Sequence, residues 1–162
     1  MNIALLGYGR MGKSIETIAL DRNHNITIKA TSSTTTFDFS ETDVAIDFSI
    51  PSTAVNNIKK AIEAGVPVIS GTTGWLDHYD EILDYCRANN GTFLYASNFS
   101  LGVNIFFEIN SRLSQLMASV EGYSTEIEEI HHTQKLDAPS GTAITLAEQI
   151  IENTNYKGWT LD

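Results

Sequence analysis

The stretch that decides the fold is Asn2-Ile3-Ala4-Leu5-Leu6-Gly7-Tyr8-Gly9-Arg10-Met11-Gly12, near the start of a chain of 162 residues. Its apolar part, from Asn2 to Leu6, predicts a buried strand, and apolar residues then recur at helical spacing to about Asn23. A G-x-G-x-x-G motif between a strand and a helix is typical of a loop that binds the pyrophosphate of a dinucleotide, because glycine permits a tight turn and a close approach of the backbone. A glycine-rich turn without a ligand is the alternative interpretation.

The alternation of strands and helices continues to about residue 100. Apolar runs predict four more strands, at Asn25 to Ala30, Val44 to Ser49, Val66 to Ser70 and Thr92 to Tyr95. The expected helices between them carry Val55, Ile58 and Ile62, after a cap at Ser52 or Thr53, and then Tyr79, Ile82, Leu83 and Cys86. This order predicts an α/β fold with a Rossmann-type doubly wound parallel sheet, which forms a dinucleotide-binding domain over residues 1–100.

Short polar segments follow two of these predicted strands. Gly71-Thr72-Thr73-Gly74 follows the fourth strand, and Ala96-Ser97-Asn98-Phe99 follows the fifth. In open α/β sheets the carboxyl ends of the strands form the ligand crevice, so we expect both segments on the same side of the sheet as Gly7. The second strand ends in Lys29-Ala30-Thr31-Ser32-Ser33, with no acid to hold a ribose hydroxyl. NAD and NADP therefore both stay open, and Lys13 or Lys29 could help to hold a 2′-phosphate.

A second, smaller domain is expected over residues 101–162. An amphipathic helix from Leu101 to Val120 leaves the nucleotide domain, and a strand from Thr125 to His131 and a helix from Thr142 to Asn153 follow. We expect an α+β substrate-binding and catalytic domain that is incomplete at its C-terminus.

The segment between that strand and that helix concentrates groups suited to acid–base chemistry. It reads His131-His132-Thr133-Gln134-Lys135-Leu136-Asp137-Ala138-Pro139-Ser140-Gly141-Thr142. Histidine exchanges a proton near neutral pH, lysine holds negative charge nearby, and Ser-Gly-Thr suits a helix N-terminus that binds a carboxylate or a phosphate. The alternatives are a solvated loop or a structural histidine pair, with Ser-Gly-Thr acting only as a cap. A metal site is not expected, because the chain has one cysteine and no acidic residue stands at ligand spacing.

Composition and charge exclude several classes of protein. The net charge is −10 with no basic run, so nucleic acid and anionic membrane surfaces are poor partners, and any anion site must be built locally. Hydrophobic content of 42% and charged content of 19% describe a soluble globular chain. Cys86 is the single cysteine, and we expect it to be a core thiol in a reducing compartment. The apolar run before Gly7 is too short for a signal peptide or a membrane span, which predicts a cytoplasmic protein.

Four of these segments together resemble the dihydrodipicolinate reductase family, whose enzymes are also called 4-hydroxy-tetrahydrodipicolinate reductases. They are Gly7 to Gly12, Gly71 to Gly74, Ser97 to Asn104, and Glu129 to Ala143 with its His-His-x-x-Lys-x-Asp-Ala-Pro-Ser-Gly-Thr motif. The resemblance covers Asn2 to about Glu152. It implies an oxidoreductase that uses NADH or NADPH to reduce a small cyclic dicarboxylate, 4-hydroxy-tetrahydrodipicolinate, to tetrahydrodipicolinate in the diaminopimelate route of lysine biosynthesis.

The resemblance also implies roles for individual residues. The pyrophosphate would be held by Gly7, Tyr8, Gly9, Arg10, Met11 and Gly12. The nicotinamide side would be lined by Gly71, Thr72, Thr73, Ala96, Ser97, Asn98 and Phe99. His131 would donate the proton and Lys135 would be the second catalytic residue, while the substrate would contact His132, Ser140, Gly141 and Thr142.

The chain departs from the family pattern in two respects. The acid after the second strand is absent, and the sequence stops at Asp162, where the family continues with further strands of the substrate domain and a return to the nucleotide domain. We therefore expect a fragment or a truncated chain, and a homo-oligomer, a homotetramer in a full-length member, built largely through the substrate-domain sheets. Two alternatives stay open: another Rossmann dehydrogenase that acts on an amino or hydroxy acid, and a nucleotide-binding module without catalysis.

Overall fold

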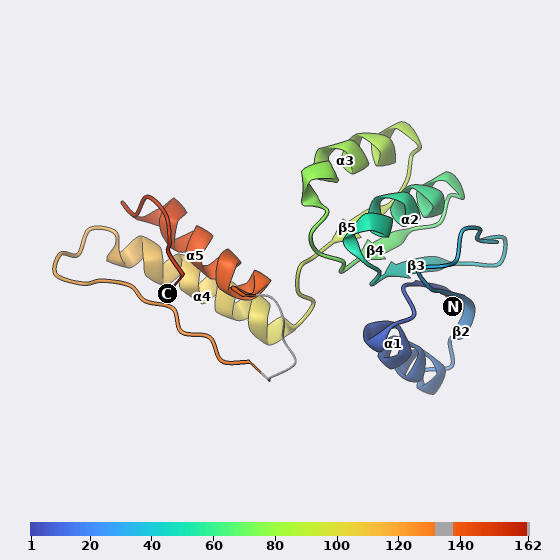
Figure 1. The fold of residues 1–162 in the computed structure, drawn as a ribbon, viewed down its shortest axis with the longest axis horizontal. Coiled ribbons are helices and arrows are strands. Elements are labelled where there is room, and N and C mark those ends of the chain that lie inside the picture. Colours follow the sequence, from blue (N-terminus) through green and yellow to red (C-terminus); the bar gives the residue numbers. More distant parts are fainter. Residues whose placement is uncertain (132–137, 162) are drawn as a thin grey trace. The chain divides into compact units, whose positions relative to one another are not determined.

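A computed structural model of the protein describes residues 1–131 and 138–161. The chain divides into two compact units, Met1–Ser97 and Asn98–Asp162 (Figure 1). Within the described residues, none of the helices is both long and apolar enough to cross a bilayer.

The first unit is a five-stranded, fully parallel sheet with helices between its strands. The elements follow the chain in the order β1 (Asn2–Leu6), α1 (Arg10–Asp21), β2 (Asn25–Ala30), β3 (Val44–Asp47), α2 (Pro51–Glu63), β4 (Val68–Ser70), the 3₁₀ turn η1 (Leu76–His78), α3 (Tyr79–Ala88) and β5 (Phe93–Tyr95). The strands lie in the order β2-β1-β3-β4-β5. This is the doubly wound α/β architecture expected from the alternating pattern, and the Rossmann-type prediction is confirmed.

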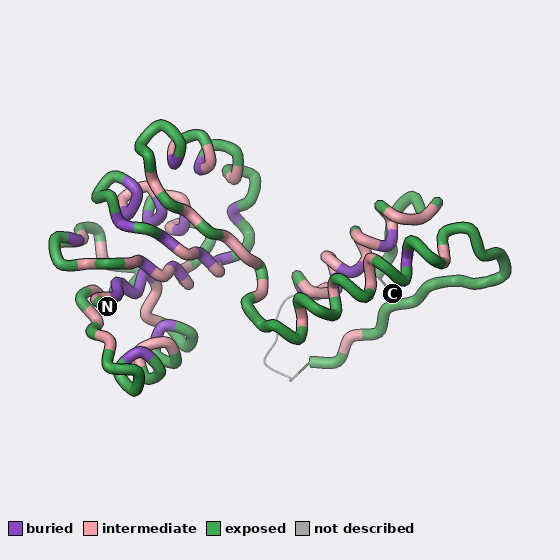
Figure 2. Tube along the Cα trace, turned by 180° about the vertical axis from the view of Figure 1, so that it is seen from behind, coloured by how far each residue is buried: buried purple, intermediate pink, exposed green. Residues whose placement is uncertain are grey.

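The core of this unit lies on both faces of the sheet because side chains alternate along a strand. On β1, Ala4 and Leu6 pack with α2 and α3 residues such as Ile58, while Ile3 and Leu5 pack against α1. The buried stretches therefore follow the strands and the inner sides of the helices (Figure 2). A strand with apolar residues at every position is what burial on both faces requires.

The N-cap of helix α2 lies two or three residues earlier than the sequence suggested. Its N-cap is Ile50, whose side chain has no capping oxygen, and Pro51 occupies the first turn. Proline suits this position because its fixed φ is already helical and its missing N–H is not needed there. Thr53 instead donates its hydroxyl hydrogen to the Ile50 carbonyl at 3.2 Å, so the predicted cap at Ser52 or Thr53 is wrong.

The second unit contains two packed helices, α4 (Leu101–Met117) and α5 (Gly141–Asn153). Each begins with a serine N-cap: Ser100 accepts from the Val103 N–H, and Ser140 accepts from the Ala143 N–H. A polar pair also joins the helices, because the Asn110 amide donates to the Leu146 carbonyl at 3.1 Å. The apolar stripe predicted for α4, which includes Ile105, Ile109 and Leu113, is present but exposed, and Ile109 keeps 57% of its surface.

The segment from Thr125 to His131 is not a strand, which corrects the prediction. It is irregular backbone, and the described residues of the second unit contain no strand to pair with it. A strand needs a ladder partner for its N–H and C=O groups, and residue pattern alone does not supply one. The alternation here was also imperfect, since Ile127 and Ile130 have opposite parity, and both side chains are exposed.

Candidate functional site

The first candidate site lies where the strand order reverses. From β1 the chain passes to β2 on one side, and β3 pairs with β1 on the other side, with Leu6 opposite Asp47. In doubly wound sheets, ligands bind in the crevice beyond the carboxyl ends of the strands at such a switch point. The residues that leave β1 and β3, Gly7 and Phe48, are therefore in the position expected for ligand contacts.

The glycine turn after β1 is closely packed at two of its three glycines. Gly7 has φ +111°, and a Cβ there would lie 2.1 Å from the Phe48 carbonyl oxygen. A Cβ on Gly12 would lie 2.3 Å from the Gly7 carbonyl oxygen. Gly9, the N-cap of α1, differs, because no described atom outside its chain neighbours lies within 4 Å of a Cβ placed there. Gly7 and Gly12 therefore shape the turn, while Gly9 leaves open space beside the first N–H groups of α1.

The other predicted pyrophosphate residues lie on the first turn of α1 or just before it. Arg10 and Met11 are exposed, with Met11 keeping 48% of its surface. Tyr8 donates its backbone N–H to the Ala30 carbonyl at 2.7 Å, so that amide is already used within the fold. The N–H groups of the first helical turn have no partner inside the helix and point out from its end.

A charged cluster stands beside the turn. Glu16 accepts a hydrogen bond from the Tyr8 hydroxyl and pairs with Lys29, whose ammonium lies 5.3 Å from the centre of the Tyr8 ring. Lys29 and Tyr8 lower the pKa of Glu16, and Glu16 raises the pKa of Lys29. The charge of Lys29 is therefore largely compensated, which weakens its predicted role as a partner for a 2′-phosphate.

The segment after β4 is held against the end of β3. The Gly71 N–H donates to the Asp47 carbonyl at 2.9 Å, and the Trp75 indole donates to the Thr72 carbonyl at 2.6 Å. Thr72 keeps only 5% of its surface, and its hydroxyl donates to the Asp47 carboxylate. Thr73 is exposed, so it and Gly71 present more surface to a ligand than Thr72 does.

The four residues after β5 span the two units. Ala96 donates its N–H to the Ser70 carbonyl at 3.2 Å, which continues the sheet, and Ser97 ends the first unit. Asn98 begins the second unit, and its side chain accepts the Ser100 N–H at 2.8 Å, just before α4. Phe99 is half-exposed at 48%.

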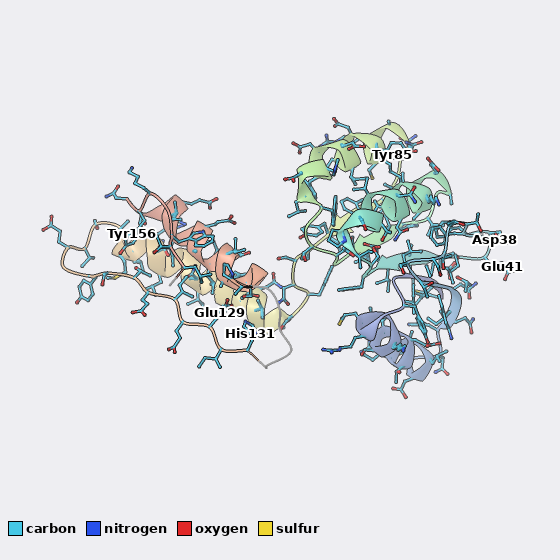
Figure 3. The ribbon with its side chains drawn as sticks, in the orientation of Figure 1. Asp38, Glu41, Tyr85, Glu129, His131 and Tyr156 are labelled. Atoms are coloured by element: carbon cyan, nitrogen blue, oxygen red, sulfur yellow. The ribbon has the colours of Figure 1, made fainter. Side chains whose placement is uncertain are left out.

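The second candidate site is the start of α5. Glu129 accepts the Ser140 N–H at 2.8 Å with one oxygen, and its other oxygen lies 2.9 Å from His131 Nε2 (Figure 3). The hydrogen bond from Ser140, followed by that from His131, lowers the pKa of Glu129 from 4.5 to about 2. An ionised carboxylate can only accept, so Nε2 carries the hydrogen and Nδ1 is the nitrogen left for chemistry.

The N-terminus of α5 offers a place for an anion. Ser140 is 6% exposed and its hydroxyl accepts the Ala143 N–H at 3.1 Å, so its side chain acts as the helix cap. Gly141 and Thr142 follow, and their N–H groups lie in the first turn, where a helix leaves its amides unpaired. His132 and Lys135, the other predicted residues of this site, lie outside the described residues.

Sequence reasoning missed two acidic residues at these sites. Asp47 is fully buried at the end of β3. The only indication of it in the sequence is that an acidic residue ends an otherwise apolar strand. Glu129 stands within the reductase motif, two residues before His131, but the motif alone does not indicate a role for it. Its partner Ser140 is eleven residues away, which spacing alone does not indicate.

Comparison with known proteins identifies the family. Models of the N-terminus and the C-terminus of dihydrodipicolinate reductase match residues 20–99 and 102–159. A protein of Christiangramia forsetii named 4-hydroxy-tetrahydrodipicolinate reductase is 56% identical over 100% of this chain and 69% of its own length. The chain belongs to the dihydrodipicolinate reductase family.

Further similarities agree with this membership. A 4-hydroxy-tetrahydrodipicolinate reductase of Methanopyrus kandleri is 42% identical over 73% of this chain, a match that spans 42% of that protein. The dipicolinate-bound dihydrodipicolinate reductase of Paenisporosarcina sp. TG-14 has a similar fold, with a TM-score of 0.72 at 23% identity over 94% of this chain and 66% of that one. The chain thus spans between about two fifths and just over two thirds of the length of these relatives.

Two glycine substitutions distinguish an effect on ligand binding from an effect on the stability of the fold. Gly12→Ala places a methyl group 2.3 Å from the Gly7 carbonyl oxygen, so we expect it to destabilise the first unit, by about 1–3 kcal/mol. Gly9→Ala meets no described atom, so we expect a loss of less than about 1 kcal/mol. If the turn binds pyrophosphate, Gly9→Ala should nevertheless weaken NADH binding at least about tenfold. Thermal unfolding and calorimetric titration measure the two effects, and unchanged affinity in a folded Gly9→Ala protein would contradict the pyrophosphate role.

The depressed pKa of Glu129 predicts an acid-dependent loss of stability. A carboxyl group whose pKa is lower in the folded state stabilises the fold above its unfolded pKa, and that contribution is lost as the pH falls towards about 2. Glu129→Gln should therefore lower the melting temperature at pH 5, and the gap to the wild-type protein should shrink progressively as the pH falls to 2. Glu128→Gln, which removes the same charge from a neighbouring exposed residue, is the control. An identical pH dependence in both variants would show that Glu129 has no special role.

Proposed function

We propose that the protein reduces 4-hydroxy-tetrahydrodipicolinate to tetrahydrodipicolinate with NADH or NADPH, in the diaminopimelate route of lysine biosynthesis. The observation that carries the proposal is the 56% identity, over the whole chain, to a protein named for this activity. The two candidate sites supply groups of the kind that the reaction requires. The proposed organisation is a dinucleotide-binding domain over residues 1–100 and a substrate domain over residues 101–162, in a cytoplasmic homo-oligomer.

The pyrophosphate of the cofactor is assigned to the first unit. The N–H groups at the start of α1 and the open space at Gly9 suit a pyrophosphate, which gains from the positive end of the helix dipole. Gly71 and Thr73, with Ala96 to Phe99, are the proposed nicotinamide contacts. The nicotinamide supplies the hydride when it is bound, and the protein supplies binding and orientation.

The substrate is assigned to the second unit. One carboxylate would bind the Gly141 and Thr142 amides, where α5 concentrates unpaired N–H groups. The other carboxylate would lie near His132 and Lys135. These amides and cations hold negative charge best in a site that excludes water, which is where preorganised donors act most strongly.

His131 is the proposed proton donor. Its Nε2 is fixed on Glu129, so Nδ1 would give the proton to the centre where negative charge builds as hydride arrives. The Glu129 carboxylate stabilises the charged imidazole before that transfer and fixes the orientation of the ring. Glu129 itself stays ionised, because the pKa of its carboxyl is about 2.

Substitution of the proton donor tests the proposal. His131→Gln in the full-length protein should lower kcat by about 10²–10⁴-fold, the usual contribution of a positioned acid, and leave NADH affinity unchanged. Adding Lys135→Ala should nearly abolish turnover. His78→Gln, at an exposed histidine of the first unit, is the matched control. Turnover that survives both active-site changes would remove the assigned roles. Turnover of amino or hydroxy acids, with none of 4-hydroxy-tetrahydrodipicolinate, would assign the protein to another dehydrogenase class.

The loop after β2 generates a prediction on cofactor choice. Thr31 is the first residue after that strand, and its hydroxyl lies 2.9 Å from that of Ser33, in a turn that carries no carboxylate. Without a negative charge there, NADPH is not repelled, so kcat/KM for the two cofactors should agree within about tenfold. Thr31→Asp should then reduce the use of NADPH at least about tenfold relative to NADH. Thr36→Asp places the same charge farther along the loop and should change this ratio less; equal effects would show that Thr31 does not face the ribose.

A further inference from the structure

A buried carboxylate closes β3 at the proposed cofactor site. Asp47 has no exposed surface and accepts hydrogen bonds from Ser70 Oγ at 2.8 Å, Thr72 Oγ1 at 2.7 Å and Asn57 Nδ2 at 3.3 Å. Burial raises the pKa of the Asp47 carboxyl, and hydrogen bonding to Ser49, Thr72, Ser70 and Asn57 opposes that rise. The Asp47 carboxylate therefore accepts from donors of three separate segments. It joins α2, the end of β4 and the loop beyond β4 at one point.

The Thr72 hydroxyl is the centre of this network. It accepts the Ser49 N–H at 2.8 Å, so its single hydrogen is left to donate to Asp47. The Thr72 carbonyl is also used, because it accepts the Trp75 indole N–H. With 5% of its surface exposed, Thr72 has little left to offer a ligand directly.

The network reaches the glycine turn through the backbone that follows β3. A Cβ on Gly7 would lie 2.6 Å from the Ser49 nitrogen, so the turn rests directly on the peptide that Thr72 holds. Phe48 donates its N–H to the Leu6 carbonyl at 2.9 Å, which ties the preceding peptide, between Asp47 and Phe48, to the end of β1. The loops after β1, β3 and β4, which face the proposed ligand, are therefore all positioned relative to the Asp47 carboxylate. A cofactor would not touch that carboxylate.

We infer that Asp47 is a positioning residue for the cofactor: acting through Thr72, it sets the spacing between the glycine turn and the Gly71–Gly74 loop. This inference rests on the proposed function, since it takes the cofactor to lie across those two loops. It also assigns Thr72, predicted as a cofactor contact, an indirect role. Binding of the pyrophosphate and of the nicotinamide then both depend on a group with no exposed surface.

The test compares variants at the two ends of the hydrogen bond between Thr72 and Asp47. Asp47→Asn keeps the shape of the side chain and removes its charge, and Thr72→Val keeps the volume and removes the hydroxyl. Each should raise the Kd and KM for NADH about tenfold. The kcat at saturating NADH and the KM for 4-hydroxy-tetrahydrodipicolinate should change less than about twofold, because the groups proposed to bind the substrate are untouched. Thr72→Ser retains the hydroxyl and should recover most of the affinity that Thr72→Val loses.

Two further measurements make the outcome decisive. The double variant should be no weaker than about the worse single variant, since both changes break one connection. Amide hydrogen exchange at Ser49 and Gly71 should accelerate in both single variants, with Ser114→Ala, a buried hydroxyl of the second unit, as the control that leaves exchange and NADH affinity unchanged.

The possible failures are distinct. A wild-type protein that binds neither NADH nor NADPH would overturn the proposed function itself. Wild-type binding with unaltered affinity in folded Asp47→Asn and Thr72→Val proteins would overturn the positioning role alone. Additive losses in the double variant, or unchanged amide exchange, would likewise separate Asp47 from Thr72 and refute the inference.

Discussion

The first unit depends on the close approach of two backbones at the end of the sheet. Gly7 leaves β1 with φ +111° and lies against the Phe48 carbonyl, where a side chain of any kind would collide. The contact lies at the switch point, because β2 and β3 flank β1 on opposite sides and α1 and α2 pack on opposite faces of the sheet. The position therefore requires glycine for both φ and space.

Both candidate sites solve the same problem, how to hold polar groups in a fixed geometry close to a ligand. At the end of β3 a buried acid collects donors from distant parts of the chain, and at the start of α5 Glu129 joins His131 to the cap residue Ser140. The two acids differ in environment. Burial raises the pKa of Asp47, whereas hydrogen bonds lower the pKa of Glu129. Glu129, which has to stay charged beside an imidazole, is thus stabilised in its charged form by hydrogen-bond donors and partial exposure. Asp47, which joins loops, is buried.

Much of the fold could be read from local pattern, and the failures have physical causes. The bounds of β1 and β2 agree with the predicted runs because burial of one or both faces of a strand determines which residue types occur along it. The start of α2 was misplaced because proline at the first turn outweighed nearby hydroxyl residues. The segment before His131 resembled a strand, yet pairing depends on a partner that no local pattern specifies. The role of Asp47 was equally hidden, since its donors Asn57, Ser70 and Thr72 lie 10 to 25 residues away.

A chain of net charge −10 can bind anions only where its own acids are kept away. Neither α1 nor α5 has an acid in its first turn, whereas α3 begins with Asp80 and Glu81. Helices α2 and α4 also lack such acids, so their absence permits an anion site without specifying one. What separates α1 and α5 is a glycine at the opening, Gly9 or Gly141, with no described atom near a Cβ built there. At the start of α5, Glu129 already accepts the Ser140 N–H, which leaves the Gly141 and Thr142 amides for a ligand. Unpaired amides and an open approach occur together only at these two among the described helices, which is why the pyrophosphate and the substrate carboxylate are assigned to them.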